Sequence, residues 1–354
     1  MSLTPEHIEA LESLGYKREE GMFLYLVAIH SGYFTHRHFL TFAKTRPGYF
    51  SHEFIRKLLQ QKHAGYDTFR SGARVYHLFS RQIYQAIGKD DLRTRRRHSL
   101  EYIRTRLVTL DFILRNPQRN YLETETEKVP FFENVLGLDR KVLPVKSYRS
   151  SLSREATPRY FVDRFPIFVT DATSSLPVAT FTFVDSGSVT LLRFKTHLLA
   201  YGELLRVLPR FEFLFVAPTS RLFHEAESEF FVSIFNRYGH VSIPDLLKYF
   251  RVRQAWDEQK PVASADVFFL SEARRRFSRK IFESLYEQWR FGKLQDGELA
   301  HKLQPSVNKP PALFQGVISG ESLRIFYPVK RRSPETCISE DSENDSRHFD
   351  EVSK

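Results

Sequence analysis

Two aspartates and a lysine in the middle of the chain stand in an order that could support metal-dependent cleavage of a phosphodiester. Asp163 falls in one predicted strand, Asp185 ends the next, and Lys195 lies in the predicted helix that follows. Two carboxylates can hold Mg²⁺, and a nearby lysine can orient the attacking water. Phe183 stands where a further acid would help, and a phenyl ring binds no metal. Asp185-Ser186-Gly187 also has the composition of a strand-ending turn. We therefore expect a degenerate set, with no cofactor unless a Mg²⁺-dependent nuclease activity is present.

The elements that would position this set form a predicted nuclease-like α/β core. Alternation of apolar residues predicts strands, and helical spacing predicts helices. The core comprises strands over residues 159–169, 177–184 and 211–217 and helices over 190–208 and 220–238. A leucine-rich stripe predicts a long helix over 93–115 before it. Alternating glutamates predict an exposed edge strand over 121–129, and the Arg-, Lys- and Ser-rich residues 139–158 predict a loop.

The first part of the chain has the order and spacing of a winged helix-turn-helix. Helices are predicted over 22–30, 35–43 and 51–62, and strands over 65–69 and 74–79 pair as a hairpin. In such a module the second helix enters the major groove, and the hairpin contacts the backbone or minor groove. The candidate DNA contacts are Arg37, His52, Arg56, Lys57, Gln60, Gln61, Lys62, Arg70 and Arg74. Among them, Lys57 and Lys62 are expected to reach phosphates. Three helices and a hairpin also occur in protein–protein modules, so that alternative stays open.

Three consecutive arginines, Arg95, Arg96 and Arg97, stand at the start of the predicted long helix. Cations at a helix N-terminus are unfavourable by about 0.3–1 kcal/mol, so we interpret the triplet as a phosphate contact, with a solvated linker as the alternative. His36 and His38 are the nearest pair of histidines. On a helix their rings point about 200° apart, so they cannot share an ion, and we predict no metal site.

Composition sets the general class. The 354 residues carry a formal charge of +11, and 42% of them are apolar, which is ample for packed cores. A chain this basic often binds a polyanion, although a solubilising surface is the simpler reading. The one cysteine, Cys337, excludes a disulfide framework within the chain. No signal peptide or membrane-spanning run is recognised, so we expect a cytoplasmic protein without a membrane partner.

The predicted organisation has four parts. Residues 1–92 form the winged helix, 93–238 the α/β domain, 239–330 a mostly helical extension with a last strand pair over 316–327, and 331–354 a disordered tail rich in Ser, Glu and Asp. We therefore predict an α+β or α/β fold with an N-terminal winged helix and a helical C-terminal extension.

The chain resembles the replication-relaxation proteins of bacterial plasmids and integrative elements over about residues 20–235. The matching segments are Phe23-Leu24, Phe39-Leu40, Ile55-Arg56-Lys57-Leu58, Val75-Tyr76-His77-Leu78, His98-Ser99-Leu100, Phe183-Val184-Asp185-Ser186-Gly187, Lys195 to Tyr201, and Arg210 to Pro218. The resemblance implies DNA binding, a role in replication or transfer of mobile elements, and a restriction-endonuclease-like second domain. At the Phe183 position the family usually has an acid, so the departure puts catalysis in doubt.

From these observations we predict a DNA-binding accessory protein in replication, relaxation or transfer of a plasmid or integrative element. Its expected partners are double-stranded DNA, replication or transfer proteins of the element, and a second copy in a homodimer. One alternative is a Mg²⁺-dependent nickase using Asp163, Asp185 and Glu123. Another is a transcriptional regulator whose second domain makes only protein contacts.

Overall fold

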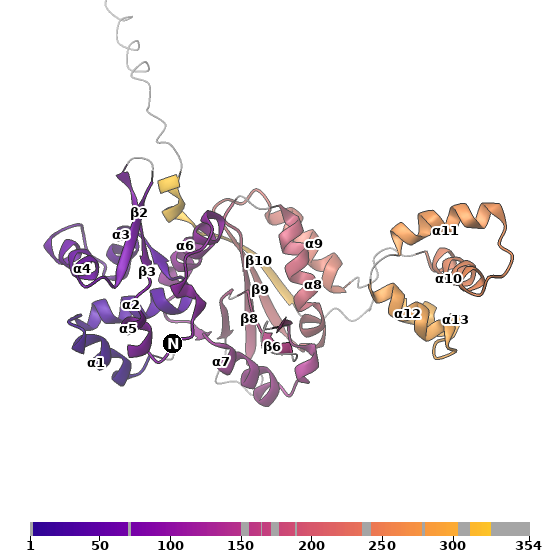
Figure 1. Cartoon of the computed structure of the whole chain (residues 1–354), viewed down its shortest axis with the longest axis horizontal. Helices are drawn as coiled ribbons and strands as arrows, with labels where there is room; N and C mark the ends of the chain where they lie inside the picture. Colours follow the sequence, from indigo (N-terminus) through magenta and orange to yellow (C-terminus); the bar gives the residue numbers. More distant parts are fainter. Residues whose placement is uncertain are drawn as a thin grey trace, which may run out of the picture.

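The computed structural model describes residues 3–69, 72–149, 156–163, 165–170, 177–187, 190–235, 242–277, 280–303 and 312–326. The fold is mixed α+β, as the sequence predicts. Apolar side chains gather in three clusters, one in the N-terminal part, one around a central sheet and one in a C-terminal helical bundle. Figure 1 shows the arrangement of these three parts. Within the described ranges, no helix is both long and apolar enough to cross a bilayer.

The N-terminal part places a three-stranded sheet beside short helices. Its elements are α1 (Pro5–Ser13), α2 (Arg18–His30), β1 (Tyr33–Phe34), α3 (His36–Phe42), α4 (Tyr49–Gln60), β2 (Ala64–Thr68), β3 (Arg74–Leu78) and α5 (Arg81–Ala86). The strands are ordered β1-β3-β2, and both pairings are antiparallel. The predicted helix over 35–43 and the hairpin are therefore present.

Helix α4 begins two residues before the predicted start and ends two residues before the predicted end. Gly48 occupies the N-cap position in an extended conformation, and its N–H donates to the Ser51 hydroxyl over 3.2 Å. Ser51 is thus inside the first turn rather than at its cap. At the other end Gln61 caps the helix, and Lys62 has a left-handed φ of 54°, which ends it.

Helix α6 (Leu100–Arg115) lies between the N-terminal part and the central sheet (Figure 1). Leu107, Val108 and Phe112 belong to the core of the sheet, whereas Leu110 belongs to the N-terminal core. The helix begins at Leu100, not at residue 93, because Ser99 caps it and accepts from the Tyr102 N–H. The preceding residues form a 3-10 turn, η2 (Arg93–Arg95), and a loop.

A buried polar contact ties two separate segments, those of His38 and Ser322, to α6. Asp111 of α6 accepts from His38 Nε2 over 3.0 Å, and from the Ser322 backbone N–H and hydroxyl over 3.1 and 2.6 Å. The Thr35 N–H donates to His38 Nδ1 over 2.9 Å, so the ring proton lies on Nε2. Burial alone would raise the pKa of Asp111, but the hydrogen bonds from His38 and Ser322 hold it below its usual value.

The central sheet has five strands in the order β10-β9-β8-β7-β4. They are β4 (Asn120–Leu122), β7 (Ile167–Thr170), β8 (Val178–Val184), β9 (Phe211–Ala217) and β10 (Ala312–Ile318). The pairs β4–β7 and β7–β8 are antiparallel, and β8–β9 and β9–β10 are parallel. Figure 1 shows α6 on one side of the sheet and α8 (Leu191–Val207) and α9 (Phe223–Phe235) on the other.

The predicted strand over 159–169 is wrong, as is the predicted loop over 139–158. A 3-10 turn, η4 (Arg140–Val142), leads into a hairpin of β5 (Val145–Arg149) and β6 (Ala156–Tyr160), and β7 follows only at Ile167. Phe161 has a left-handed φ of 51°, which a strand cannot contain. Asp163 therefore lies in a turn between two strands that belong to different sheets.

The predicted edge strand over 121–129 is correct only at its start. Residues Asn120–Leu122 pair with β7, and α7 (Glu125–Pro130) and a π-helical turn, η3 (Phe131–Val135), follow. Glu127 accepts from the Glu123 N–H over 2.8 Å and from the Thr124 hydroxyl over 3.1 Å. Glu125 and Glu127 thus stand in the first turn of a helix, where negative charge is favourable.

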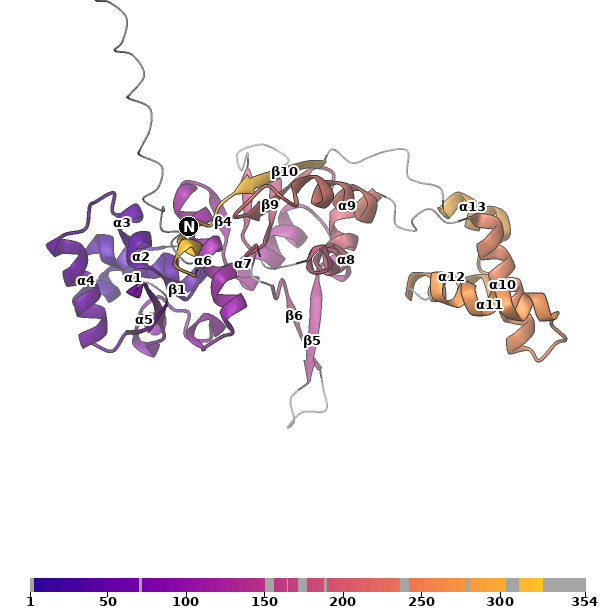
Figure 2. The same cartoon turned by 90° about the horizontal axis from the view of Figure 1, so that it is seen from above.

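The C-terminal part holds four helices, α10 (Ile243–Asp257), α11 (Ser264–Arg276), α12 (Lys280–Arg290) and α13 (Asp296–Leu303), with a core of their own. They stand apart from the sheet in Figure 2. The predicted strand pair over 316–327 is wrong, because β10 is a single strand that joins β9, and a 3-10 helix, η5 (Glu321–Phe326), then packs on α6. The predicted disordered tail lies outside the described residues.

Candidate nucleic-acid interface

Helix α4 divides into a buried and an exposed face. Ser51, Phe54, Ile55 and Leu58 face the core, where the Phe54 ring stacks on Phe39 at 4.1 Å between centroids. The opposite stripe is exposed and consists of Tyr49, His52, Arg56 and Gln60. Tyr49 is 85% exposed, which is unusual for a large aromatic side chain. Figure 1 shows α4 at the left-hand margin of the molecule, with its outer side uncovered.

Arg56 is held along the surface of α4 by its neighbours. Its Nε donates to Glu53 over 2.8 Å, and its Nη1 donates to the side-chain Oε1 of Gln60 over 2.7 Å. The hydrogen bond from Arg56 lowers the pKa of the Glu53 carboxyl, so this carboxylate stays ionised at neutral pH. The guanidinium is thus oriented in advance, but its charge is offset until another anion competes for it.

The start of α3 lies beside α4. The His36 and His52 rings are 5.1 Å apart, and burial together with the nearby His52 lowers the pKa of His36. His36 is therefore neutral at pH 7. Arg37, the next residue, is exposed, as the sequence led us to expect for a surface contact.

Three further candidate DNA contacts, on α4 and just after it, lie outside the exposed stripe. Lys57 Nζ donates to the buried Glu20 carboxylate over 2.6 Å and to the Gly15 carbonyl over 2.9 Å, so its expected phosphate contact is not supported by its position. Gln61 Nε2 donates to the Leu14 carbonyl over 3.1 Å. Lys62 is exposed just past the end of α4.

The β2–β3 hairpin adds an exposed aromatic and cationic side. The Arg74 guanidinium lies 4.5 Å from the Tyr66 ring centroid, and both side chains are exposed. This stacking positions a planar cation beside a planar ring, an arrangement suited to phosphates and bases. Arg70 lies outside the described residues.

Arg95 ends the 3-10 turn η2, and Arg96 and Arg97 lie in the loop before α6. The triplet therefore does not stand at the N-terminus of α6, and the expected cost of cations there does not arise. Arg95 is half-buried, whereas Arg96 and Arg97 are exposed. The Tyr33 hydroxyl donates to the Arg96 carbonyl over 3.2 Å, which fixes the loop. Arg97 Nη2 donates to Asp67 of β2 over 3.1 Å, and this contact places it beside the hairpin.

The proposed nuclease residues are engaged in structural contacts. Asp163 accepts from the Tyr201 hydroxyl over 3.0 Å and lies 2.9 Å from His197 Nδ1. Burial alone would raise its pKa, but the contacts with His197 and Tyr201 lower it. The Gly187 N–H donates to Asp185 over 2.9 Å, which closes the strand-ending turn.

Lys195 and Glu123 point to other partners. Lys195 Nζ lies 2.8 Å from Glu229 of α9. Glu123, the third acid of the nickase alternative, is buried and accepts from the Tyr25 hydroxyl, joining β4 to α2. Within the described ranges, no three His, Cys, Asp or Glu side chains gather as a metal site would require.

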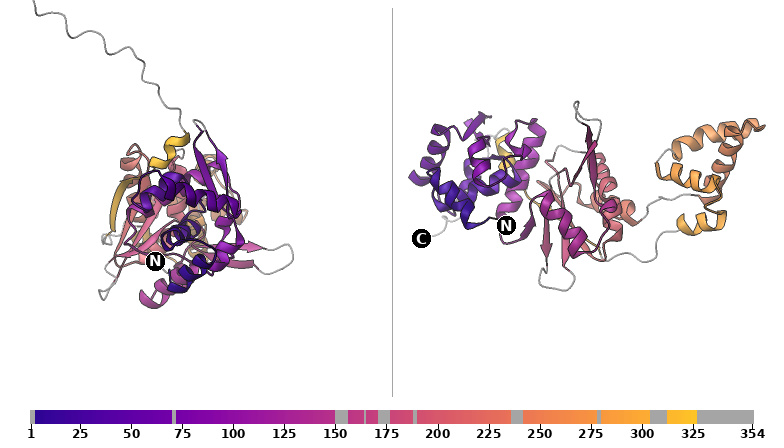
Figure 3. Two further views of the ribbon diagram at one scale, coloured as in Figure 1. Left: turned by 90° about the vertical axis from the view of Figure 1, so that its left-hand side faces the viewer. Right: turned by 60° about the horizontal axis from the view of Figure 1, so that its bottom comes forward.

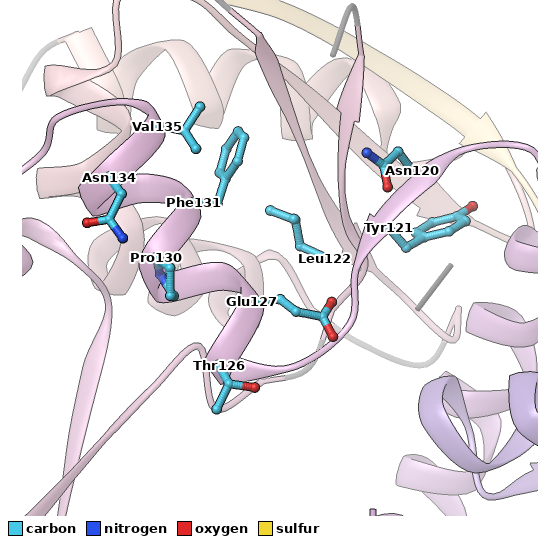
Figure 4. A pocket seen from close by; sticks show the side chains of 9 residues that line it. All are labelled: Asn120, Tyr121, Leu122, Thr126, Glu127, Pro130, Phe131, Asn134 and Val135. Atoms are coloured by element: carbon cyan, nitrogen blue, oxygen red, sulfur yellow. The ribbon is translucent and has the colours of Figure 1, made fainter. Parts of the chain in front are cut away.

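A shallow hollow of about 400 Å³ lies between β4, α7 and η3 (Figure 4). Its lining is mainly apolar, from Leu122, Pro130, Phe131 and Val135, and its carboxylate, Glu127, is engaged in the start of α7. The hollow therefore lacks a free acid–base group.

The sequence missed the partners that decide these roles, because they are distant along the chain. Glu20 precedes Lys57 by 37 residues, and His197 follows Asp163 by 34. Comparisons of the chain with protein-family models, with curated proteins and with solved structures found no match.

Proposed function

We propose that this protein binds double-stranded DNA through α4 and the β2–β3 hairpin. The support is the order of the N-terminal elements, in which a helix and a short strand precede two helices and a hairpin, and β1 completes the sheet beside β3. A winged helix-turn-helix has its elements in this order, and the second helix of its pair enters the major groove. The observation that carries the proposal is the exposed stripe of Tyr49, His52, Arg56 and Gln60.

The groups on this stripe match the chemistry of a duplex. Arginine and glutamine can read guanine and adenine edges in the major groove. Arg74 and Arg97 beside the hairpin would reach phosphates. Arg56 contacts the Glu53 carboxylate, and Arg97 contacts the Asp67 carboxylate. In a complex, a DNA phosphate would compete with these carboxylates for the two guanidinium groups.

We further propose that the central domain is a restriction-endonuclease-like core that has lost its metal site. The support is the succession of α6, the antiparallel strands β4, β7 and β8, helix α8 and the parallel strand β9. Phe183 is buried on β8, and Asp163 is bound by His197 and Tyr201. By the resemblance in sequence, the role would be accessory, in replication, relaxation or transfer of a plasmid or integrative element.

Fluorescence anisotropy with a labelled 30-base-pair duplex tests DNA binding. We expect an affinity that falls steeply with salt, because phosphate neutralisation releases counterions. Arg56→Ala with Arg74→Ala should weaken binding, whereas Lys260→Ala with Lys302→Ala, an exposed pair on the helical bundle, should have little effect. Salt-independent binding, or equal effects of the two double variants, would contradict the proposal.

Incubation of supercoiled plasmid with Mg²⁺ or Mn²⁺ tests the loss of catalysis. We expect no nicking above a buffer control. Nicking that disappears in Asp163→Ala or Asp185→Ala would establish the nickase alternative instead.

A further inference from the structure

The β5–β6 hairpin stands away from the rest of the protein as a two-stranded ribbon. It forms a sheet of its own, and five residue pairs join its strands, from Val145 opposite Tyr160 to Arg149 opposite Ala156. Figures 2 and 3 show it projecting from the body of the molecule. Its base is fixed by Glu125, which accepts from the Tyr160 N–H over 3.0 Å and from Arg159 Nε over 2.9 Å.

Most of the ribbon side chains that the structure describes are exposed on both faces. Val145, Lys146 and Ser147 of β5 are exposed, and so are all residues of β6 before Tyr160. An isolated two-stranded hairpin is only marginally stable in water. A ribbon that buries so little therefore gains stability chiefly when something else binds it.

The charge of the ribbon indicates a polyanion. Between residues 145 and 160 the sequence has four cations, Lys146, Arg149, Arg154 and Arg159, and one carboxylate, Glu155. Lys146 and Arg159 are directly opposite each other across the strands. Like charges at such a position are destabilising. Among the described residues, Arg159 has a carboxylate partner and Lys146 has none.

We propose that the β5–β6 ribbon is a second DNA-binding element that lies in a groove or along the backbone of the duplex. This inference rests on the proposed function, because it assigns a further contact to the same DNA. The major groove of B-DNA admits a two-stranded ribbon. A phosphate near Lys146 and Arg159 would relieve their repulsion, and Tyr148, with Lys146 Nζ 5.8 Å from its ring, adds a surface for contact with sugar or base.

Salt titration of duplex binding separates this contact from the one on α4. Lys146→Ala with Arg159→Ala should weaken binding about tenfold and reduce the slope of log K against log salt by about 2, since about 0.9 counterions are released per phosphate contact. Lys146→Ala alone, which leaves the contact between Arg159 and Glu125 intact, should reduce the slope by about 1. The control pair, Lys260→Ala with Lys302→Ala, should leave the slope unchanged.

A cleavage experiment locates the ribbon directly. Cys337→Ser removes the one native thiol, and Ser147→Cys then carries a chelated-iron label on the exposed ribbon. We expect strand scission of the bound duplex, and none from the same label at Ser284→Cys on α12.

The outcomes distinguish the two proposals. If the wild-type chain does not bind duplex DNA, the proposed function fails. If it binds, and Arg56→Ala weakens it, but the ribbon variants match the control pair and Ser147→Cys gives no scission, only the ribbon proposal is overturned. A ribbon variant that changes the sedimentation coefficient and leaves the salt slope intact would show instead that the ribbon joins two copies of the chain.

Discussion

Removing the charge of either of two neighbouring cations on α4, Arg56 and Lys57, should affect a different property of the protein. Lys57 is bound to Glu20, whose side chain is 1% exposed, so Lys57→Met leaves a buried carboxylate without its counter-charge. Arg56 is exposed, and its removal leaves Glu53 in contact with water. We therefore expect Lys57→Met to reduce stability and Arg56→Ala to reduce DNA affinity.

The size of the effect follows from the contacts that remain. Removing one partner of a buried ion pair costs about 3–5 kcal/mol. Glu20 keeps the hydrogen bond from the Lys17 N–H over 2.8 Å, so we expect the lower end, about 3 kcal/mol. For a chain of this size that lowers the melting temperature by roughly 4 °C. Arg56→Ala should change stability by less than about 0.5 kcal/mol and weaken duplex binding by about 1–3 kcal/mol.

Urea unfolding followed by circular dichroism measures the first quantity, and anisotropy at one salt concentration measures the second. The double variant Glu20→Gln with Lys57→Met should recover part of the lost stability, because the unpaired charge is gone. If Lys57→Met unfolds like the wild type and loses DNA affinity as Arg56→Ala does, then Lys57 contacts phosphate and our reading of its pair with Glu20 is wrong.

Three further predictions concern contacts that hold the fold together. Asp163→Asn should lower stability at pH 7. Because the folded-state pKa of Asp163 is depressed, the contribution of its carboxylate to stability should be fully present above about pH 4 and should be lost as the pH falls through that lower pKa. Urea unfolding midpoints measured over a pH series check this. Asp111→Ala should cost about 3 kcal/mol in urea unfolding, since it leaves buried donors on two other segments without an acceptor. Gly316→Ala should destabilise the sheet, because the added Cβ would lie 2.2 Å from the Phe223 ring, whereas the control Gly297→Ala meets no atom within 4 Å and should raise the melting temperature slightly.

Local patterns in the sequence predict many of the elements but few of their partners. The strand over 211–217 has the predicted bounds, and the helix over 190–208 differs by a residue at each end, because each has one strong period and a clear stop. Pro218 comes directly after the strand, and Thr190 is the N-cap of the helix. The α4 stripe was also predictable, since helical spacing alone separates its polar side from Phe54 and Leu58.

The failures have specific causes. Thr124 and Glu127 have the spacing of a capping box, but the alternation of glutamates with other residues there also predicts a strand. The strand predicted through Asp163 is interrupted at Phe161, which has a left-handed φ that the local sequence does not predict. The sequence predicts a loop in place of the ribbon, because the residues there are mostly polar and have no apolar period. Strand β10 pairs with β9 across almost a hundred intervening residues, a distance that periodicity cannot span.

That last pairing affects how the chain folds during synthesis. Residues 218–311, including all four helices of the C-terminal bundle, leave the ribosome after β9 and before β10. Closing so large a loop is entropically costly and slow compared with local helix formation. The edge of the phenylalanine-rich strand β9 therefore stays unpaired while the separate helical bundle forms. During this period the nascent chain is most prone to aggregation.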